Sequence, residues 1–393
     1  MYCNDYVPYT FSMPWAVIGR SAIVYTDSFL YLSGFLNAHN LLQDLEKNGN
    51  INMKDRLLAR WFRLFPMFLS LMLFCTYILP SINNGPQWNL VVEEHSRVCQ
   101  NNMWKSFLFI HNYFGFEEMC LTHTHQIGID MQLYMATLPL MLIQWKFRKL
   151  GFILIVGIAV ASTVLRYLAT YWYDISMFVY YGITIQKLLD AARYSYILPT
   201  HRATIYLIGV MMAYFIKSKK SHIKLSRTQA GLVWAMCLTL AVYSIVSPYK
   251  MGLEEYKYEH FPAAMFAAVT PILWGLFMSM AHWCICHDYA GIGTAFVESR
   301  VFKFFNKIAY SVYLTQFPIF FYNVGVQRHS EHYTPLLLFN VPEMAVVLVV
   351  SILTTVAIEM PFNQVYRIYF GKSPPIFSEK YLISRFSSVT VLL

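Results

Sequence analysis

Three arginines in the first part of the chain have a spacing that suits binding of a phosphate group. Arg56, Arg60 and Arg63 are four and three residues apart, so on a helix their side chains share one face. A guanidinium is always charged and binds a phosphate through two parallel hydrogen bonds. Basic clusters of this kind also anchor membrane helices on the cytosolic side, and from the residues alone anchoring is the commoner reason for them.

An acidic residue, Asp27, lies within an apolar stretch, DSFLYLSGFL, that precedes the arginines. A charge inside a membrane-length segment is costly unless it is paired, so Asp27 marks either a functional site or an acid at the membrane interface. Arg166 and Asp174, in a later apolar stretch, are expected to pair with each other, which would lower the cost of both. A further group of polar residues is expected to form interhelical hydrogen bonds: Tyr310, Ser311 and Gln316.

Two clusters of histidine and cysteine resemble metal sites in composition but not in spacing. Zinc sites use wider paired spacings or histidines four residues apart on a helix, and neither cluster has these. We therefore expect no metal. The clusters are His282, Cys284, Cys286 and His287, and the pair His123 and His125 near Asp130.

The composition identifies the elements that must position these residues. The chain has 393 residues, of which 57% are hydrophobic and only 13% charged, whereas soluble proteins average about 25% charged residues. Apolar segments of about 20 residues recur along the whole length, which predicts an all-α, polytopic membrane protein. We predict nine spans: 20–38, 64–79, 127–145, 152–170, 202–216, 230–246, 262–284, 305–324 and 336–358.

The positive charge of the chain predicts its orientation rather than a nucleic-acid partner. The formal charge of +9 comes from short basic clusters between the spans, and no nucleic-acid motif accompanies them. The loop side richer in lysine and arginine should be cytosolic, which places the N-terminus in the lumen or outside and the C-terminus in the cytosol. The endoplasmic reticulum and the plasma membrane both fit. We expect a lumenal segment at 1–19, a membrane domain at 20–362 and a cytosolic tail at 363–393.

The longest polar loop, 81–126, falls on the lumenal side and holds Cys99 and Cys120. Because that compartment is oxidising and the loop closed by a bridge would be short, a disulfide between them is expected. Two free thiols remain the alternative, since the geometry that a bridge requires cannot be read from sequence.

The order of motifs along the chain resembles the acyltransferase-3 family of membrane proteins, and more closely its animal branch called nose resistant to fluoxetine. The resemblance begins with DSFLYLSGFL followed by R-x-x-R-x-x-P, at Arg60, Arg63 and Pro66. It covers nearly the whole chain. The later matching segments are GPQW at 85–88, the pair Cys99 and Trp104, FIHN ending at Asn112, the run from Cys120 to DMQLY, PTHRATIYLIG at 199–209, FNKIAYSVYLTQFPI at 305–319 and IEMPF at 358–362.

This resemblance implies transfer of an acyl group from cytosolic acyl-CoA to a hydroxyl on a lipid, sugar or small molecule, with acyl-CoA as co-substrate and no bound cofactor. It implies that Arg60 and Arg63, with Arg56 beside them, bind the acyl donor. Membrane lipids surround the protein as further partners. The resemblance also implies that Asp130 and Gln132 line a polar cavity. With these two we group two residues of the first span, Asp27 and Ser33.

The chain also departs from the family pattern. Family members carry a first helix with the catalytic histidine before the segment that begins at Asp27, and the nose-resistant branch adds a cysteine-rich lumenal domain before that helix. This sequence is expected to lack both, either as a fragment or as a shortened paralogue, with the catalytic histidine expected upstream. His39 is a weak substitute, because its predicted cytosolic position suits the donor better than a lumenal acceptor. Thr124 and His125 also begin a stretch that differs from the family. A catalytically inactive lipid carrier is therefore the alternative to an enzyme, and an ion-coupled transporter is a weaker one.

Overall fold

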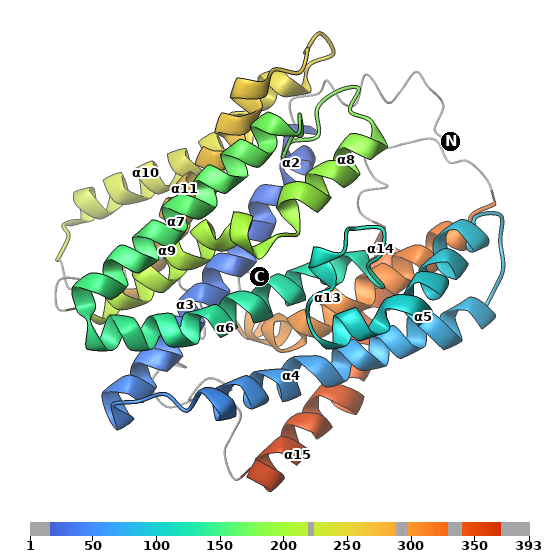
Figure 1. The fold of residues 1–393 in the computed structure, drawn as a ribbon, viewed down its shortest axis with the longest axis horizontal. Helices are drawn as coiled ribbons and strands as arrows, with labels where there is room; N and C mark the ends of the chain where they lie inside the picture. The colour runs from blue at the N-terminus through green and yellow to red at the C-terminus, as the bar shows by residue number, and fades with distance from the viewer. Residues whose placement is uncertain are drawn as a thin grey trace. The chain divides into compact units, whose positions relative to one another are not determined.

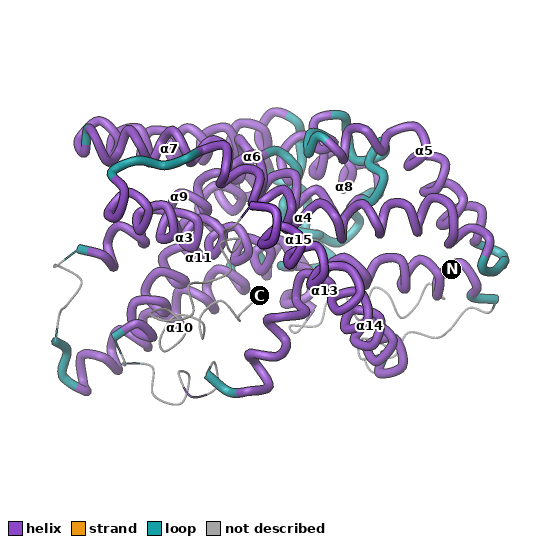
Figure 2. Tube along the Cα trace, turned by 90° about the horizontal axis from the view of Figure 1, so that it is seen from below, coloured by secondary structure: helices purple, strands orange, loops and turns teal. Residues whose placement is uncertain are grey.

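The structure is a computed structural model that describes residues 16–218, 224–287, 289, 295, 298–328 and 340–370. Every regular element within these ranges is helical, as the tube in Figure 2 shows, so the predicted all-α class is confirmed for the described residues. The expected N-terminal segment and C-terminal tail lie largely outside the described residues.

Thirteen α-helices form the framework of the described residues, and short π and 3-10 turns connect or extend several of them (Figure 1). These helices are α2 (Ala16–Arg20), α3 (Ala22–Asn48), α4 (Met53–Leu73), α5 (Glu94–Phe107), α6 (His125–Lys146), α7 (Arg148–Trp172), α8 (Ile185–Ala191), α9 (Pro199–Lys217), α10 (Arg227–Val246), α11 (His260–Cys286), α13 (Arg300–Val326), α14 (Val341–Thr354) and α15 (Met360–Phe370). The π turns are η1 (Phe74–Ile78), η3 (Asn89–Glu93), η6 (Ala192–Tyr196) and η10 (Thr355–Glu359), and the 3-10 turns are η2 (Leu79–Ser81), η4 (His111–Tyr113), η5 (Thr122–Thr124) and η8 (Tyr249–Gly252).

Six of the nine predicted spans coincide with helices that are long and apolar enough to cross a membrane. Among the described residues these six are Met53–Ser81, Thr122–Lys146, Arg148–Trp172, Arg227–Gly252, His260–Cys286 and Val341–Tyr366. The other three predicted spans fall on α3, α9 and α13, which are helical but are not among the six. The physical reason is their content of charged and polar side chains, which lowers the hydropathy of any membrane-length window.

The chain forms two compact units, which are described separately. Unit 1 is built mainly from residues 52–128 and 299–391, and its described helices are α4, α5, α13, α14, α15 and the first turn of α6. Unit 2 is built mainly from residues 8–51 and 129–298, and holds α2, α3, the rest of α6, and α7 to α11.

Glycines set the closest helix crossing of unit 2, where α3 packs along α9. A side chain on Gly34 would overlap the backbone carbonyl of Tyr206, and one on Gly209 would overlap that of Tyr31. Small residues allow membrane helices to approach this closely. Helix α7 packs on both α9 and α11, and α10 packs on α11. This crossing brings the polar residues of α3 against those of α9.

In unit 1, α13 packs against α14, and α4 packs against α15. A glycine on α13 again permits a close contact, because a side chain on Gly325 would meet the ring of Trp88. The indole nitrogen of Trp88 donates a hydrogen bond to the carbonyl of Pro80 at 3.2 Å, which ties the start of the loop 81–126 to the end of the preceding span.

Candidate functional site

The three arginines of the donor motif lie on α4, within unit 1. Helix α4 begins at an asparagine cap, where the side chain of Asn52 accepts a hydrogen bond from the backbone of Asp55 at 3.4 Å. Arg56 and Arg60 are half-buried and Arg63 is exposed, so all three guanidinium groups occur on one partly solvated helix. The shared helix confirms the geometric part of the sequence prediction, while the role of the arginines in donor binding stays a prediction.

Polar side chains of α13 form hydrogen bonds to other helices of unit 1. Tyr310 donates a hydrogen bond to the carbonyl of Leu64 on α4 at 2.7 Å. Ser311 donates to the carboxylate of Glu359 at 3.4 Å and accepts a hydrogen bond from Thr355 at 2.7 Å. Tyr310 and Ser311 thus form the interhelical hydrogen bonds expected of them, whereas Gln316 is exposed.

Glu359 also lies within electrostatic reach of Arg63. Glu359, on η10, thus places an acid near the cationic face of α4. A face of this kind attracts an anion and can form charge-assisted hydrogen bonds with it.

A disulfide between Cys99 and Cys120 bridges the loop 81–126. Behind it, the Nε2 atom of His111 lies 3.1 Å from the carbonyl of Thr124. Burial lowers the pKa of His111 to about 4, so this imidazole is neutral at physiological pH. His111 is therefore a structural residue of the loop.

His123 and His125 occupy the turn that leads into α6. The ring of His123 stacks on Phe317 with a centroid distance of 4.1 Å, and its backbone carbonyl accepts a hydrogen bond from Tyr313. Among the described residues no group of three or more potential metal ligands is close enough to hold an ion. His282 packs against Phe35 with a centroid distance of 4.0 Å, which is a packing role.

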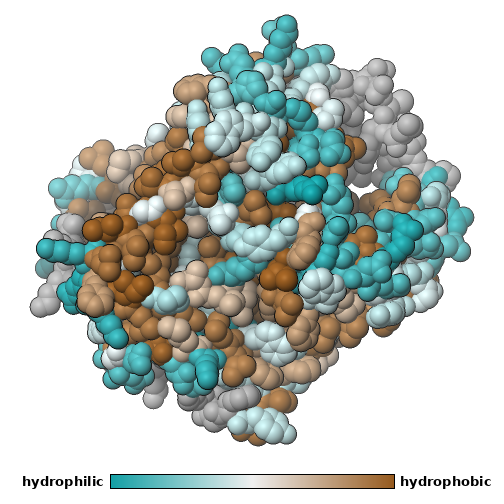
Figure 3. All heavy atoms as spheres, in the orientation of Figure 1, coloured by the Kyte–Doolittle hydropathy of each residue, from teal (hydrophilic) through white to brown (hydrophobic). Residues whose placement is uncertain are grey.

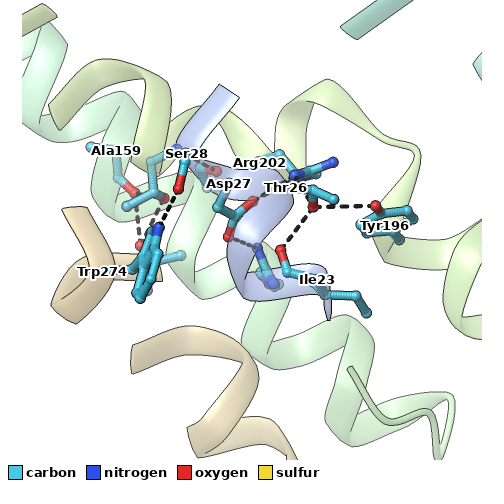
Figure 4. Close-up of polar contacts among 12 residues, drawn as sticks. Ile23, Thr26, Asp27, Ser28, Ala159, Tyr196, Arg202 and Trp274 are labelled. Atoms are coloured by element: carbon cyan, nitrogen blue, oxygen red, sulfur yellow. Dashed lines mark hydrogen bonds and ion pairs between the residues drawn. The ribbon is translucent and has the colours of Figure 1, made fainter. Parts of the chain in front are cut away.

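Asp27, the acid singled out in the sequence, is fully buried in unit 2 and is paired. Its Oδ1 atom accepts two hydrogen bonds from Arg202 of α9, at 3.1 Å from Nε and 2.6 Å from Nη2 (Figure 4). The same Nη2 atom donates to Thr26 at 3.1 Å, and the hydroxyl of Tyr196 donates to Thr26 at 3.2 Å. Figure 4 shows these side chains converging from α3, η6 and α9.

The expected pair of Arg166 and Asp174 does not form. Arg166 of α7 instead lies near Asp27, with 3.7 Å between its Nη1 atom and Oδ2 of the acid. Asp174 follows the end of α7 in a left-handed backbone conformation and pairs with His260 at 2.6 Å. The prediction was wrong because the chain leaves the helix in a left-handed conformation at Asp174, which pairs with His260, while the tertiary fold brings Arg166 to Asp27 of α3.

Sequence reasoning missed the importance of Arg202, which is 1% exposed and supplies the partner of Asp27. The available signal was its position inside the PTHRATIYLIG motif, directly before an apolar segment, where a charge needs a partner as much as Asp27 does.

The other residues that were expected to line a cavity form a second polar group between α3 and α6, separate from Asp27. Ser33 donates a hydrogen bond to Asp130 of α6. Asn37 donates to Ser33 at 3.0 Å and to the hydroxyl of Tyr206 at 3.2 Å. Gln132 is half-buried on α6, two residues beyond Asp130. The structure therefore joins Ser33 with Asp130, but connects Asp27 to arginines instead.

His39, the weak candidate for a base, is buried on α3 in unit 2. A ring nitrogen of His39 lies 3.0 Å from the side-chain nitrogen of Gln43, and the ring stacks on Phe35. The pair Glu46 and Lys217, 2.7 Å apart, lies within electrostatic reach. These neighbours give His39 a packed environment within its own unit, and they add no support for a catalytic role.

Helices of membrane length with buried polar clusters between them define an integral membrane protein of the polytopic, all-helical class. Residues 4–360 match the acyltransferase-3 family model, whose description is "Acyltransferase domain", and the chain belongs to this family.

Two curated proteins of Caenorhabditis elegans are similar to this chain. "Nose resistant to fluoxetine protein 6" is 23% identical over 88% of the chain and 45% of its own length. "Regulator of hypoxia-inducible factor 1" is 26% identical over 60% of the chain and 48% of its own length. The chain thus spans about half the length of these relatives. No solved structure matches it significantly.

Proposed function

We propose that the protein is a membrane acyltransferase that takes an acyl group from acyl-CoA and transfers it to a hydroxyl acceptor. Family membership supports acyl transfer as the reaction class. The observation that carries the donor assignment is the set of three arginines on one partly exposed face of α4. CoA presents several phosphate oxygens, and arginine is the side chain best suited to hold them in a fixed orientation.

In the proposed reaction the acceptor oxygen attacks the thioester carbonyl and the C–S bond breaks. The acceptor loses its proton to a general base, and the CoA thiolate leaves and takes up a proton. The family resemblance attributes the base to a histidine upstream of Asp27, so we assign no described residue to this step. The contribution that we assign to the described residues is binding of the donor by Arg60 and Arg63, with Arg56 beside them.

We also propose that α3, α9 and α13 cross the membrane, which would give nine spans. Helices of 27, 19 and 27 residues are about 40, 28 and 40 Å long at 1.5 Å per residue, close to or above the thickness of the hydrocarbon core. Their polar residues are largely turned inward, and Asp27 and Arg202 neutralise each other there. The basic loops favour a cytosolic C-terminus in the endoplasmic reticulum or the plasma membrane.

The donor assignment is tested by measuring the affinity of the purified protein for labelled CoA, which carries the phosphates without an acyl chain. The double variant Arg60→Ala, Arg63→Ala should bind at least about 100-fold more weakly, because each charge-assisted contact contributes about 1.5–3 kcal/mol. Lys54→Ala is the matched control, since Lys54 is an exposed cation on the same helix. Unchanged CoA affinity in the double variant would refute the assignment.

The same preparation separates an enzyme from a carrier. Release of free CoA thiol from acetyl-CoA or palmitoyl-CoA, dependent on an added hydroxyl acceptor, is the result expected for an enzyme. Binding of the donor without any thiol release would favour the carrier.

A further inference from the structure

The buried ion cluster of unit 2 contains more positive than negative charge. Arg166 is 4% exposed and Arg202 1% exposed, and both face Asp27, which is fully buried. The electrostatic neighbours of Arg166 in the described chain are Asp27, Arg202 and Tyr196, together with His201. One carboxylate therefore serves two guanidinium groups, and the neighbouring tyrosine and histidine supply no second anion when they are neutral.

The contacts of the two arginines are unequal. Arg202 makes two hydrogen bonds to Asp27, whereas the Nη1 atom of Arg166 stays 3.7 Å from it, beyond hydrogen-bond distance. The Nε and Nη1 atoms of Arg166 are buried and donate no hydrogen bond to any described residue. A buried charge without a matching partner is strongly unfavourable in a membrane protein, and such residues commonly mark a binding site.

A second unsatisfied group belongs to the same part of unit 2. The hydroxyl of Ser195, which is 1% exposed, has no hydrogen-bond partner among the described residues. Ser195 directly precedes Tyr196, a neighbour of Arg166, and η6 packs against α7. A guanidinium and a hydroxyl thus keep donors without a hydrogen bond, and the acceptor beside Arg166, Oδ2 of Asp27, lies 3.7 Å from its Nη1 atom.

The position of Arg166 along α7 indicates where such an acceptor would come from. Trp172 is 69% exposed and Tyr171 is 42% exposed at the end of the helix. Tryptophan and tyrosine gather where the hydrocarbon core meets the lipid head groups. Arg166 lies six residues before Trp172, which is about 9 Å along the helix axis. It therefore lies about 9 Å below the level of Trp172, within the hydrocarbon core.

The outward surface of α7 is apolar. Val160, Val164 and Leu165 are all exposed, and Figure 3 shows a brown apolar band over this helix. A helix with its side chains is only about 10–12 Å across. An amphiphile whose acyl chains lie on the outer side of α7 would therefore have its head group within one helix width of Arg166. An apolar face next to a buried cation that shares its one acid with Arg202 matches an amphiphile with an anionic head.

We propose that Arg166 is the anchor of a binding site for the anionic head group, a phosphate or a carboxylate, of a membrane-resident amphiphile. The head group would accept hydrogen bonds from Nε and Nη1 of Arg166 and would balance the second positive charge of the cluster. Asp27 and Arg202 would remain paired with each other. The site is defined by binding alone, so it does not depend on the proposed acyl transfer.

The test measures binding and thermal stabilisation of the purified full chain by amphiphiles with different head groups. Dioleoylphosphatidic acid supplies a phosphate head, oleate a carboxylate head, and dioleoylglycerol the same acyl chains without a charge. At least one of the two anionic probes should bind about tenfold or more tightly than dioleoylglycerol and raise the melting temperature. Equal binding of all three probes would overturn the proposal, and this comparison needs no variant.

Variants locate the site. Arg166→Gln should remove the preference for the anionic probes while leaving the protein folded, because Asp27 and Arg202 still neutralise each other. Arg148→Gln, at the exposed opposite end of the same helix, is the matched control and should keep the preference. An anionic preference that survives in Arg166→Gln would assign the effect to another cation and overturn the site. If inorganic phosphate or acetate stabilised the protein as strongly as the amphiphiles, the amphiphile part of the proposal would be wrong.

Discussion

Replacing Asp27 with asparagine should destabilise the protein more than replacing Arg202 with glutamine, although both changes remove the same ion pair. The reason is the unequal charge of the cluster. Asp27→Asn leaves Arg166 and Arg202 buried together without an acid. Arg202→Gln leaves Asp27 with Arg166 at 3.7 Å, a pair whose charges still balance.

The structure allows a rough magnitude for each change. Removing one partner of a buried ion pair costs about 3–5 kcal/mol, because it leaves an uncompensated charge. Asp27→Asn should fall at the upper end, about 5 kcal/mol, since it creates two unpaired cations. Arg202→Gln mainly loses two charge-assisted hydrogen bonds and should cost about 2–3 kcal/mol. The expected difference is about 2 kcal/mol in the free energy of unfolding.

The assay is reversible unfolding in mixed detergent micelles, followed by loss of the helical circular dichroism signal. Tyr196→Phe is the control within the same cluster, because it removes only a neutral hydrogen bond to Thr26 and should cost about 1 kcal/mol or less. The double variant of Asp27→Asn with Arg202→Gln should be more stable than Asp27→Asn alone. If the two single variants lost equal free energies of unfolding, or if Arg202→Gln lost more, the argument that the cluster holds an excess of positive charge would be refuted.

Three further predictions concern the loop and the helix crossing. Loss of the disulfide in Cys99→Ser should cost about 3 kcal/mol and expose one new thiol, at Cys120, to alkylation after unfolding; unchanged labelling would argue against the bridge. Gly209→Leu should prevent α3 and α9 from approaching and reduce the yield of folded protein, whereas Gly157→Ala, which points into open space on α7, should be neutral or slightly stabilising. Because burial lowers the pKa of His111 to about 4 while the unfolded chain has a value of about 6.5, the unfolded state takes up the proton first as the pH falls. Stability should therefore drop by up to about 3 kcal/mol between about pH 6.5 and pH 4, and His111→Asn should be less sensitive to pH over that range.

Much of the fold could be predicted because it depends on local patterns. Runs of apolar residues predicted nine helices at positions where the structure has helices, and spacing alone put Arg56, Arg60 and Arg63 on one helix. Hydropathy was less decisive for α3, α9 and α13. Polar residues on these helices form hydrogen bonds and ion pairs with other helices. Hydropathy is calculated from the local sequence alone and cannot include such partners.

The contacts within the polar clusters could not be predicted, for a geometric reason. Asp27 and Arg202 are 175 residues apart in the sequence, and they meet because Gly34 and Gly209 let α3 and α9 cross closely. Sequence proximity suggested Asp174 as the partner of Arg166, but the backbone turns away at the end of α7 and Asp174 pairs with His260.

The sequence by itself determined that this is a membrane protein of the acyltransferase-3 kind, because hydropathy, basic clusters and motif order are properties of the chain. It also identified Asp27 as a residue whose charge needs an explanation. Only the tertiary structure decided that Asp27 is shared between two arginines and that Arg166 keeps unsatisfied donors. The balance of buried charge depends on which helices touch, and that is settled by packing rather than by any one segment.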